Sequence, residues 1–287
     1  MKLALGTAQF GMGYGVANSV GHIGTDHAKA ILECAWENEI RTLDTAPSYG
    51  NSEEVLGGAG MQDFSVISKI IIPDSLPISP SDWVLGELEG TLSRLGREKL
   101  RGLLIHNPSN LQLSRGLEFY DALCGLKDAG LVDKIGISIY SPQDLESLPS
   151  ELKFDIVQAP MNIMDRRLAQ GDHLEKLREN GSEIHVRSAF LQGLLLLPDS
   201  RLPDYFEPWR SLLSEFVSWT TEKNISPLRA CISYVNQIPE ISKIIVGVDS
   251  ERQLREIISA IREPSLDIPD HLQTDDLGLI NPSLWKL

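Results

Sequence analysis

Short apolar runs separated by segments with helical periodicity recur along the whole chain, and this alternation restricts its fold more than any other feature. The eight runs cover residues 3–7, 41–44, 65–69, 102–106, 134–138, 155–158, 183–188 and 243–246. Most are rich in Val, Ile and Leu and are shorter than an ordinary helix. Runs of this kind are typical of parallel strands that are buried on both faces. The sequence therefore predicts a parallel sheet.

Amphipathic stretches fill the gaps between these runs. They cover residues 26–38, 81–95, 116–129, 169–180, 228–236 and 250–261. Thr25 and the pair Ser79 and Pro80 mark two helix starts, while Gly96 and Gly130 mark two helix ends. Eight βα units with short connections fit a closed (β/α)8 TIM barrel of the α/β class better than an open doubly wound sheet.

The whole chain, residues 1–287, is expected to form one domain. Barrels of this class commonly reach 287 residues as one unit, and no repeat, linker or low-complexity segment divides the sequence. Residues 264–287 are predicted to be a C-terminal tail that closes over the barrel. The longest irregular stretch, residues 191–211, follows the seventh run, and it is either a lid over a site or a surface loop held by its aromatic side chains.

Charge and hydropathy exclude two classes of partner. A net charge of −14 and a pI near 4.9 oppose attraction to nucleic acids and to anionic membranes. No apolar stretch is long enough to cross a bilayer, and the first residues do not read as a signal peptide. A cytoplasmic protein without nucleic-acid or membrane partners is expected, and the sequence gives no indication of its oligomeric state.

The cysteines and histidines carry no metal-binding pattern. Cys34, Cys124 and Cys231 lie far apart in apolar stretches, where reduced structural thiols are the common outcome. The histidines stand at no ligand spacing with cysteines or carboxylates, so no metal site is predicted.

Four polar residues stand at or just after the ends of three runs: Asp44, Tyr49, Lys69 and His106. In a (β/α)8 barrel the carboxyl ends of all strands meet at one face, and that face carries the chemistry. These four side chains are therefore expected to converge in one site.

Together the four residues form a proton-transfer group. The tyrosine pKa near 10 is too high for acid catalysis at neutral pH unless a cation stabilises the phenolate, and Lys69 can supply that cation. Asp44 would keep Lys69 charged and oriented, and His106 would hydrogen-bond a carbonyl oxygen. Since no side chain delivers hydride, reduction of a carbonyl also requires a cofactor.

Several motifs resemble those of the aldo-keto reductases. The specific ones are LGTAQFG at residues 5–11, DTAPSYGNSEEVLG at 44–57 and LLIHNP at 103–108, and KIGIS, FDIVQAPMN, VRSAFLQGLLL and IIVGVDSERQLREI follow in that family's order. The resemblance implies a (β/α)8 barrel that binds NAD(P)(H). It implies Tyr49 as general acid or base, Lys69 and Asp44 as its tuning pair, and His106 as the donor that orients the carbonyl.

The same resemblance implies a cofactor site. Its residues would be Gly6, Thr7, Ala8, Asp44, Ser138, Gln158, Arg187, Ser188, Phe190, Gln192, Gly193, Gly247, Asp249, Arg252, Gln253 and Glu256. Ser138 and Gln158 match the residues that hold the nicotinamide amide. Ile139 stands where the family usually has Asn, and Arg187 stands where an aromatic residue often lies under the ring. A guanidinium there can stack on the ring, and its charge would favour the reduced cofactor.

The choice between NADP(H) and NAD(H) stays open. NADP-preferring members of the family place Lys or Arg near residues 247–256. Asp249 would repel a 2′-phosphate but can accept hydrogen bonds from a free ribose diol. The expected substrate is a small carbonyl compound or alcohol, for which a sugar or sugar derivative is one candidate. The residues expected to line its pocket are Tyr14, Tyr49, His106, Asn107, Asn162 and Trp209.

Two other classes of protein remain as alternatives. A barrel aldolase would form a Schiff base on Lys69, but it gives no role to Tyr49 and Asp44. A cofactor-binding regulatory or sensor protein of the same fold would keep all four residues and turn over little. Trapping with borohydride tests the first alternative, and oxidation of bound NAD(P)H by carbonyl compounds tests the second.

Overall fold

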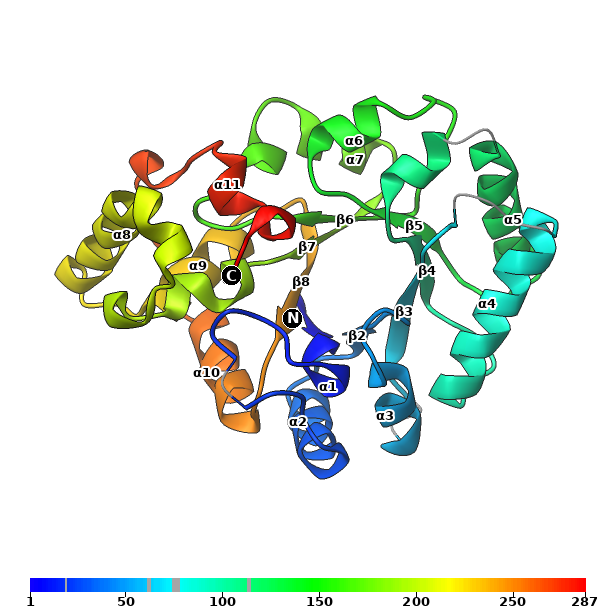
Figure 1. Cartoon of the computed structure of the whole chain (residues 1–287), viewed down its shortest axis with the longest axis horizontal. Coiled ribbons are helices and arrows are strands. Elements are labelled where there is room, and N and C mark those ends of the chain that lie inside the picture. Colours follow the sequence, from blue (N-terminus) through cyan, green and yellow to red (C-terminus); the bar gives the residue numbers. More distant parts are fainter. Residues whose placement is uncertain (19, 61–62, 74–77, 113–114) are drawn as a thin grey trace.

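Eight parallel strands close into one barrel in the described part of the chain, residues 1–18, 20–60, 63–73, 78–112 and 115–287 of a computed structural model (Figure 1). The strands are β1 (Leu3–Gly6), β2 (Thr42–Asp44), β3 (Ser65–Ile70), β4 (Gly102–Ile105), β5 (Ile135–Ser138), β6 (Ile156–Pro160), β7 (Glu183–Arg187) and β8 (Ile241–Gly247). Each pairs with its sequence neighbours, and β8 pairs with β1. The (β/α)8 barrel predicted from the alternation is confirmed.

Helices surround the barrel in Figure 1. They are α1 (Ala8–Gly11), α2 (Thr25–Glu37), α3 (Ser52–Gly58), α4 (Pro80–Leu95), α5 (Gly116–Asp128), α6 (Pro142–Glu146), α7 (His173–Glu179), α8 (Arg210–Glu222), α9 (Pro227–Asn236), α10 (Glu251–Ile261) and α11 (Leu277–Ile280). All six predicted helices are present. The helix expected over 169–180 is shorter, because Gly171 takes a left-handed φ of 60° just before α7. No described helix has both the length and the apolar character needed to cross a membrane.

Local capping explains where α4 begins and ends. The Ser79 hydroxyl accepts a hydrogen bond from the Asp82 backbone N–H at 3.1 Å, and Pro80 occupies the first helical position. At the other end, Gly96 has a φ of 64°, a left-handed conformation that glycine adopts without a Cβ penalty. The signals at Ser79, Pro80 and Gly96 therefore correspond to real caps. Thr25 instead lies inside α2, after its N-cap Gly24, and Gly130 follows Ala129, the C-cap of α5.

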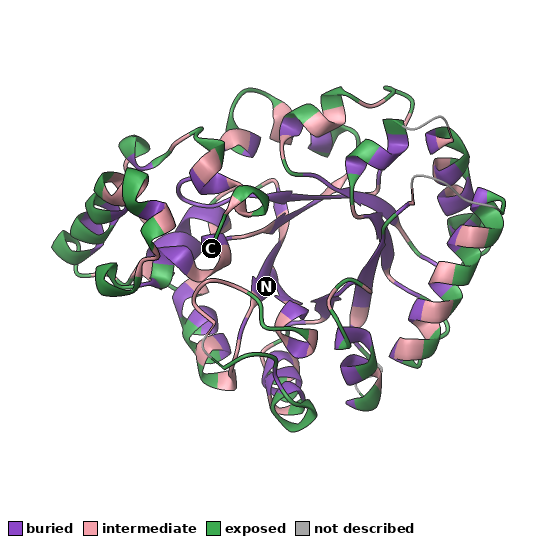
Figure 2. Cartoon of the chain, viewed as in Figure 1, coloured by how far each residue is buried: buried purple, intermediate pink, exposed green. Residues whose placement is uncertain are grey.

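Apolar side chains fill two separate regions. The larger cluster lies between the strands and the helices, whose inward sides are buried in Figure 2. A smaller cluster of Ile67, Leu104 and Ile156 fills the barrel interior. Gly136 leaves room for it, because a Cβ there would meet the Ile156 backbone oxygen and the Leu104 side chain. The interior is thus packed below the carboxyl ends of the strands, and the polar residues lie above this packing.

The irregular stretch after β7 divides into two parts. Its first part contains the 3₁₀ segment Leu191–Leu196, next to the barrel, and its second part is the 3₁₀ segment Asp204–Trp209, which leads into α8. The second part packs against the C-terminal tail, where the Tyr205 hydroxyl donates to the Gly278 carbonyl oxygen at 3.0 Å. The tail therefore covers this segment and α8, on one side of the barrel (Figure 1).

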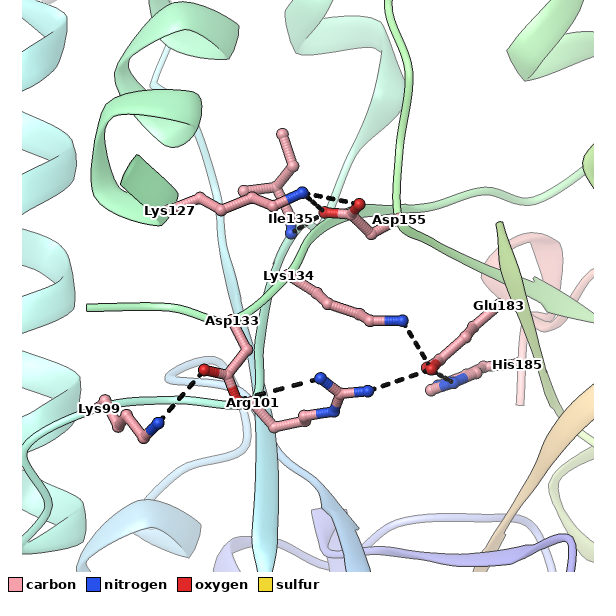
Figure 3. A network of polar contacts seen from close by, with 9 residues as sticks. All are labelled: Lys99, Arg101, Lys127, Asp133, Lys134, Ile135, Asp155, Glu183 and His185. Atoms are coloured by element: carbon pink, nitrogen blue, oxygen red, sulfur yellow. Dashed lines mark hydrogen bonds and ion pairs between the residues drawn. The ribbon is translucent and has the colours of Figure 1, made fainter. Parts of the chain in front are cut away.

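Ion pairs gather at the amino-terminal ends of strands β4 to β7 (Figure 3). The Glu183 carboxylate accepts from Lys134 Nζ at 2.7 Å, from Arg101 Nη2 at 3.1 Å and from His185 Nε2 at 3.2 Å. His185 donates from Nε2 because an ionised carboxylate only accepts, and its buried Nδ1 has no partner among the described residues. The His185 hydrogen bond and the Lys134 charge lower the pKa of Glu183 from its usual 4.5 to about 2.

We predict that Glu183→Gln lowers the free energy of unfolding by about 1–3 kcal/mol at pH 7, as measured by chemical denaturation. A carboxyl whose pKa is lowered by folding stabilises the fold above its unfolded pKa, here 4.5, and loses that effect as the pH falls toward 2. The difference between wild type and variant should therefore be smaller at pH 3.5. Glu118→Gln, which removes an exposed ion pair with Arg115, is the matched control and should change stability much less. An equal difference at both pH values would contradict the assignment.

Candidate active site

A buried ion pair joins the ends of β2 and β3. Lys69 Nζ donates to Asp44 Oδ1 at 2.6 Å and to the Thr45 carbonyl oxygen at 3.1 Å, and only 1% of the lysine side chain is exposed. Burial by itself lowers the pKa of Lys69, but the Asp44 carboxylate and the nearby Tyr49 outweigh it, so the net pKa lies above the usual 10.5. Lys69 is therefore a fixed cation.

The second oxygen of Asp44 is held from across the barrel. Gln158 Nε2, on β6, donates to Asp44 Oδ2 at 2.7 Å. This leaves Gln158 Oε1 buried without a hydrogen-bond partner among the described residues. A buried, unpaired amide oxygen is costly, so its position beside the ion pair suits a ligand that carries an N–H donor.

Tyr49 and His106 face each other next to this pair. Lys69 Nζ lies 5.1 Å from the centroid of the Tyr49 ring, whose edge-to-face contact with the His106 ring has a centroid distance of 6.2 Å. Burial lowers the pKa of His106 to about 4, and the charges of Lys69 and Arg187 add to this effect. His106 is therefore neutral at pH 7 and can donate one ring N–H. The four residues predicted from the strand ends do converge.

Close backbone contact fixes the segment that carries Tyr49. A Cβ on Gly11 would collide with the Tyr49 carbonyl oxygen, and a Cβ on Gly50 would collide with the Gly11 carbonyl oxygen. The Ser52 hydroxyl, at the start of α3, donates to the Thr7 carbonyl oxygen at 2.8 Å. The loops after β1 and β2 thus pack closely against each other, and this contact fixes the position of Tyr49.

A cavity of about 430 Å³ opens beside these residues. Its walls come from the loops after β1, β2, β7 and β8 and from the starts of α9 and α10. Of the predicted cofactor residues, those that line it are Gly6, Thr7, Ala8, Asp44, Arg187, Ser188, Phe190, Gln192, Gly193, Gly247, Asp249, Arg252, Gln253 and Glu256. Ser138 and Gln158 are buried inside the barrel and do not line it.

The cavity also has walls that sequence reasoning missed. Ser226 and Pro227 line it at the start of α9, and Asn18 lines it from the loop after β1. The Ser-Pro pair is the same start signal that marks α4, so this helix start was detectable. Asn18 gave no signal, because its position depends on a contact with Asp249, distant in the sequence, at 3.2 Å.

Two hydrogen bonds connect the loop after β1 (Tyr14 and Val16) to Gln192 in the loop after β7, and we call this connection the strap. The Val16 backbone N–H donates to the Gln192 carbonyl oxygen at 3.0 Å, and Gln192 Nε2 donates to the Tyr14 hydroxyl at 3.2 Å. Ser188, Leu191 and Gln192 all have φ between 48° and 61°, which is unusual for residues with a side chain. Such strain clusters where a ligand must be clasped, and here it borders the cavity.

The two departures from the family pattern contact each other. Arg187 Nη2 donates to the Ile139 carbonyl oxygen at 3.1 Å, and Arg187 Cζ lies 4.9 Å from the centroid of the Tyr140 ring. Ile139 itself is wholly buried, so it contributes its backbone and not its side chain to the site. The guanidinium is held at the cavity wall between an aromatic face and a carbonyl.

The residues expected to contact substrate do not all reach the cavity. Tyr14 lines it, together with Tyr49. His106 contacts the Tyr49 ring but does not line the cavity, and neither do Asn107, Asn162 and Trp209. Asn107 is exposed and bonds within its own turn, and Asn162 is wholly buried with both amide atoms bonded to backbone groups. Trp209 Nε1 donates to Asp276 Oδ2 in the tail at 2.9 Å. These three side chains serve the loops and the tail in this structure.

Outside these residues, we searched the described part of the chain for reactive thiols and for metal-binding groups. Cys34, Cys124 and Cys231 are free thiols, two of them buried. Within the described ranges, no group of three or more His, Cys, Asp and Glu side chains gathers as a metal site would. The cavity, which is lined by Asp44 and Tyr49, is therefore the strongest candidate for a binding site.

Comparisons with known proteins agree with this geometry. The model of the aldo/keto reductase family matches residues 2–278. The chain is 27% identical to a D-threo-aldose 1-dehydrogenase of a Pseudomonas species over an alignment of 300 residues, which covers 88% of this chain and 89% of that protein. It is 21% identical to a pyridoxal 4-dehydrogenase of Microbacterium luteolum, with 95% of this chain and 92% of that protein covered.

Solved structures show the same fold. A holo-form aldo-keto reductase of Bacillus halodurans superposes with a TM-score of 0.74 at 19% identity, covering 94% of this chain and 90% of that chain. A glycerol dehydrogenase of Gluconobacter oxydans superposes with a TM-score of 0.69 at 20% identity, covering 93% and 88%. At these identities the likeness concerns the fold alone.

We predict that Gly11→Ala lowers the rate of carbonyl reduction by about 10- to 100-fold, because the added methyl group pushes the Tyr49 segment away from Lys69. The rate is measured under saturating substrate, and the affinity for NAD(P)H is measured in parallel by fluorescence titration. The matched control is Gly13→Ala in the same loop, where a Cβ meets Gly21 at an ordinary 3.6 Å. Equal activity of the two variants would show that the contact does not position Tyr49.

Proposed function

The chain belongs to the aldo/keto reductase family, whose members are oxidoreductases that use nicotinamide cofactors, and on that premise we propose a specific reaction for it. The protein transfers hydride between NAD(P)(H) and a carbonyl or alcohol substrate, and Tyr49 is the general acid or base. The observation that carries this proposal is the fixed cation Lys69, held by Asp44 beside Tyr49 and His106.

Each of the four side chains has one part in proton transfer. In reduction, Tyr49 gives its hydroxyl proton to the carbonyl oxygen, and in oxidation it takes the proton back. Lys69 stabilises the phenolate that results, and Asp44 keeps Lys69 charged inside the barrel. His106, neutral at pH 7, donates to the carbonyl oxygen and orients it.

The cavity fits a nicotinamide cofactor, which supplies or accepts the hydride when it is bound. Gln158 does not line the cavity, but it bonds to Asp44, which does, and its buried Oε1, without a partner among the described residues, is an acceptor suited to the amide NH₂ group of the nicotinamide. Thr7, Ser188 and Gln192 would hold the rest of the cofactor from the cavity walls. Arg187 would lie against the ring and favour its reduced, neutral form.

For the substrate we propose a sugar or sugar derivative. Tyr14 and Tyr49 present hydroxyl groups to the cavity, and His106 packs against the Tyr49 ring, which suits a hydroxylated compound. A relative named as an aldose dehydrogenase and a structural neighbour named as a glycerol dehydrogenase support this direction. A simple aldehyde or ketone remains the second candidate.

The environment of Lys69 argues against a Schiff-base aldolase. A Schiff-base lysine must be neutral and open to the substrate, usually with a lowered pKa. Lys69 has a raised pKa, is almost wholly buried and donates to both Asp44 and the Thr45 carbonyl oxygen.

Three expectations from the sequence stay predictions. They are the cytoplasmic location, the organisation of residues 1–287 as one domain and the lack of a metal site.

The test is Tyr49→Phe, which should remove most of the turnover, at least about 100-fold, while NAD(P)H affinity changes less than about threefold. Stopped-flow fluorescence follows the oxidation of bound NAD(P)H after mixing with a panel of aldoses, aldehydes and ketones. Lys69→Met should reduce turnover to a similar degree, because the phenolate loses its cation.

The matched control is Tyr140→Phe, which keeps the ring that faces Arg187 and removes a hydroxyl outside the proposed proton path. Its rate should stay well above that of Tyr49→Phe. Near wild-type turnover of Tyr49→Phe would refute the role of this residue. If no carbonyl compound oxidises bound NAD(P)H, the hypothesis of a regulatory or sensor protein is favoured over that of an enzyme.

A further inference from the structure

The part of the cavity wall that β8 and α10 form carries more acidic than basic side chains. Asp249 and Glu256 line it together with one cation, Arg252. In Figure 1, α10 lies outside the barrel. Tyr49, by contrast, follows β2, at the carboxyl ends of the strands. If the reactive ring of a dinucleotide lies at Tyr49, as the proposed function requires, its adenosine half reaches this outer wall.

Asp249 is oriented from two sides. Its Oδ1 accepts from Asn18 Nδ2 at 3.2 Å, and its backbone N–H donates to Gln253 Oε1 at 2.6 Å. The residue is half-buried at the cavity wall, and its carboxylate also interacts with the Gln253 side chain. A carboxylate held in this way is an acceptor for the two hydroxyls of a ribose.

Part of the start of α10 is already bonded within the chain. The Ser250 hydroxyl accepts the Gln253 backbone N–H at 3.3 Å, and the Gln253 side chain accepts the N–H of Asp249, which precedes the helix. One of the first amides of α10 is therefore taken up by the cap, and the first turn also carries the acidic residue Glu251.

The arginines near this wall are paired with acids. Arg252 Nε lies 3.8 Å from Glu256 Oε1, and 85% of the Arg252 side chain is exposed, so solvent screens its charge. Arg255 bonds to Glu251 at 2.7 Å and lies 3.7 Å from Glu37, and it does not line the cavity. Among the described residues of this wall, the summed charge is negative.

We propose that this wall selects NAD(H) over NADP(H). Asp249 accepts hydrogen bonds from the adenosine ribose hydroxyls, and its charge, together with that of Glu256, repels a 2′-phosphate. Asn18 serves as the positioning residue that holds Asp249 against the cavity. The proposal rests on the proposed function, because it presupposes that a nicotinamide dinucleotide occupies the cavity.

The experiment measures the dissociation constants of NADH and NADPH by fluorescence titration of the whole protein at pH 8 and low salt. NADH should bind at least about tenfold more tightly than NADPH, because the phosphate adds two negative charges next to two carboxylates. The ratio of the two constants should shrink as salt is added, since ions screen this repulsion.

Asp249→Asn removes the charge and keeps the shape and the acceptor for Asn18. The NADH preference of this variant should fall by about tenfold, mainly through tighter NADPH binding. Glu251→Gln is the matched control, because Glu251 lies on the first turn of the same helix and pairs with Arg255 away from the cavity. Its preference should stay within about twofold of wild type.

Three results would overturn the proposal. The first is equal or tighter binding of NADPH by the wild type, and the second is an unchanged preference in Asp249→Asn. The third is a large selective loss of NADPH binding in Arg252→Gln, which would make that arginine a phosphate site. If neither NADH nor NADPH binds, the proposed function is contradicted, and this inference, which rests on it, is contradicted as well.

Discussion

The buried ion pair between Lys69 and Asp44 is the interaction on which the rest of the site depends. Moving both charges out of water costs several kcal/mol, and their attraction offsets this cost only if their other hydrogen-bonding groups are satisfied. The Thr45 carbonyl oxygen, just after β2, and the Gln158 amide, on β6, supply those bonds. The pair is therefore stable only inside a closed barrel, and the barrel is what turns a lysine into a permanent cation beside Tyr49.

The loops after β1, β2 and β7 position Tyr49 and border the cavity. Contact between the loops after β1 and β2 fixes Tyr49, and the strap between the loops after β1 and β7 borders the cavity. The contact between Asn18 and Asp249 extends the same β1 loop to the wall at α10. One loop thus touches both the proton-transfer group and the wall proposed to choose the cofactor. The amino-terminal end of the barrel, by contrast, carries the ion pairs around Glu183, to which we assign a role in stability.

Much of the fold and part of the site could be predicted because they depend on local sequence. Strand-end positions brought Asp44, Lys69 and His106 together, and the start signal at Ser79 gave a real helix cap. The remainder depends on contacts between distant segments. The bond from Gln158 to Asp44 joins residues 114 positions apart.

The departures from the family pattern could be detected in the sequence, but their consequence could not. Arg187 and Ile139 are separate departures in the sequence, whereas in the structure Arg187 donates a hydrogen bond to the Ile139 carbonyl oxygen. Asn162 and Trp209 were expected at the substrate because they are polar or aromatic and follow strands β6 and β7. Their side chains are taken up by loop and tail contacts, which no local pattern reveals.

The most direct test is the pH dependence of single-turnover NADH oxidation, measured for wild type and for Asp44→Asn with the same carbonyl substrate. Without the carboxylate, the lowering of the Lys69 pKa by burial is no longer outweighed by Asp44, so a larger fraction of the amine is uncharged at pH 8. The account predicts a rate at least about 100-fold below wild type at pH 8, and a partial recovery of the variant as the pH falls and Lys69 is protonated again. A variant with the wild-type pH profile and a rate within threefold of wild type would contradict the account.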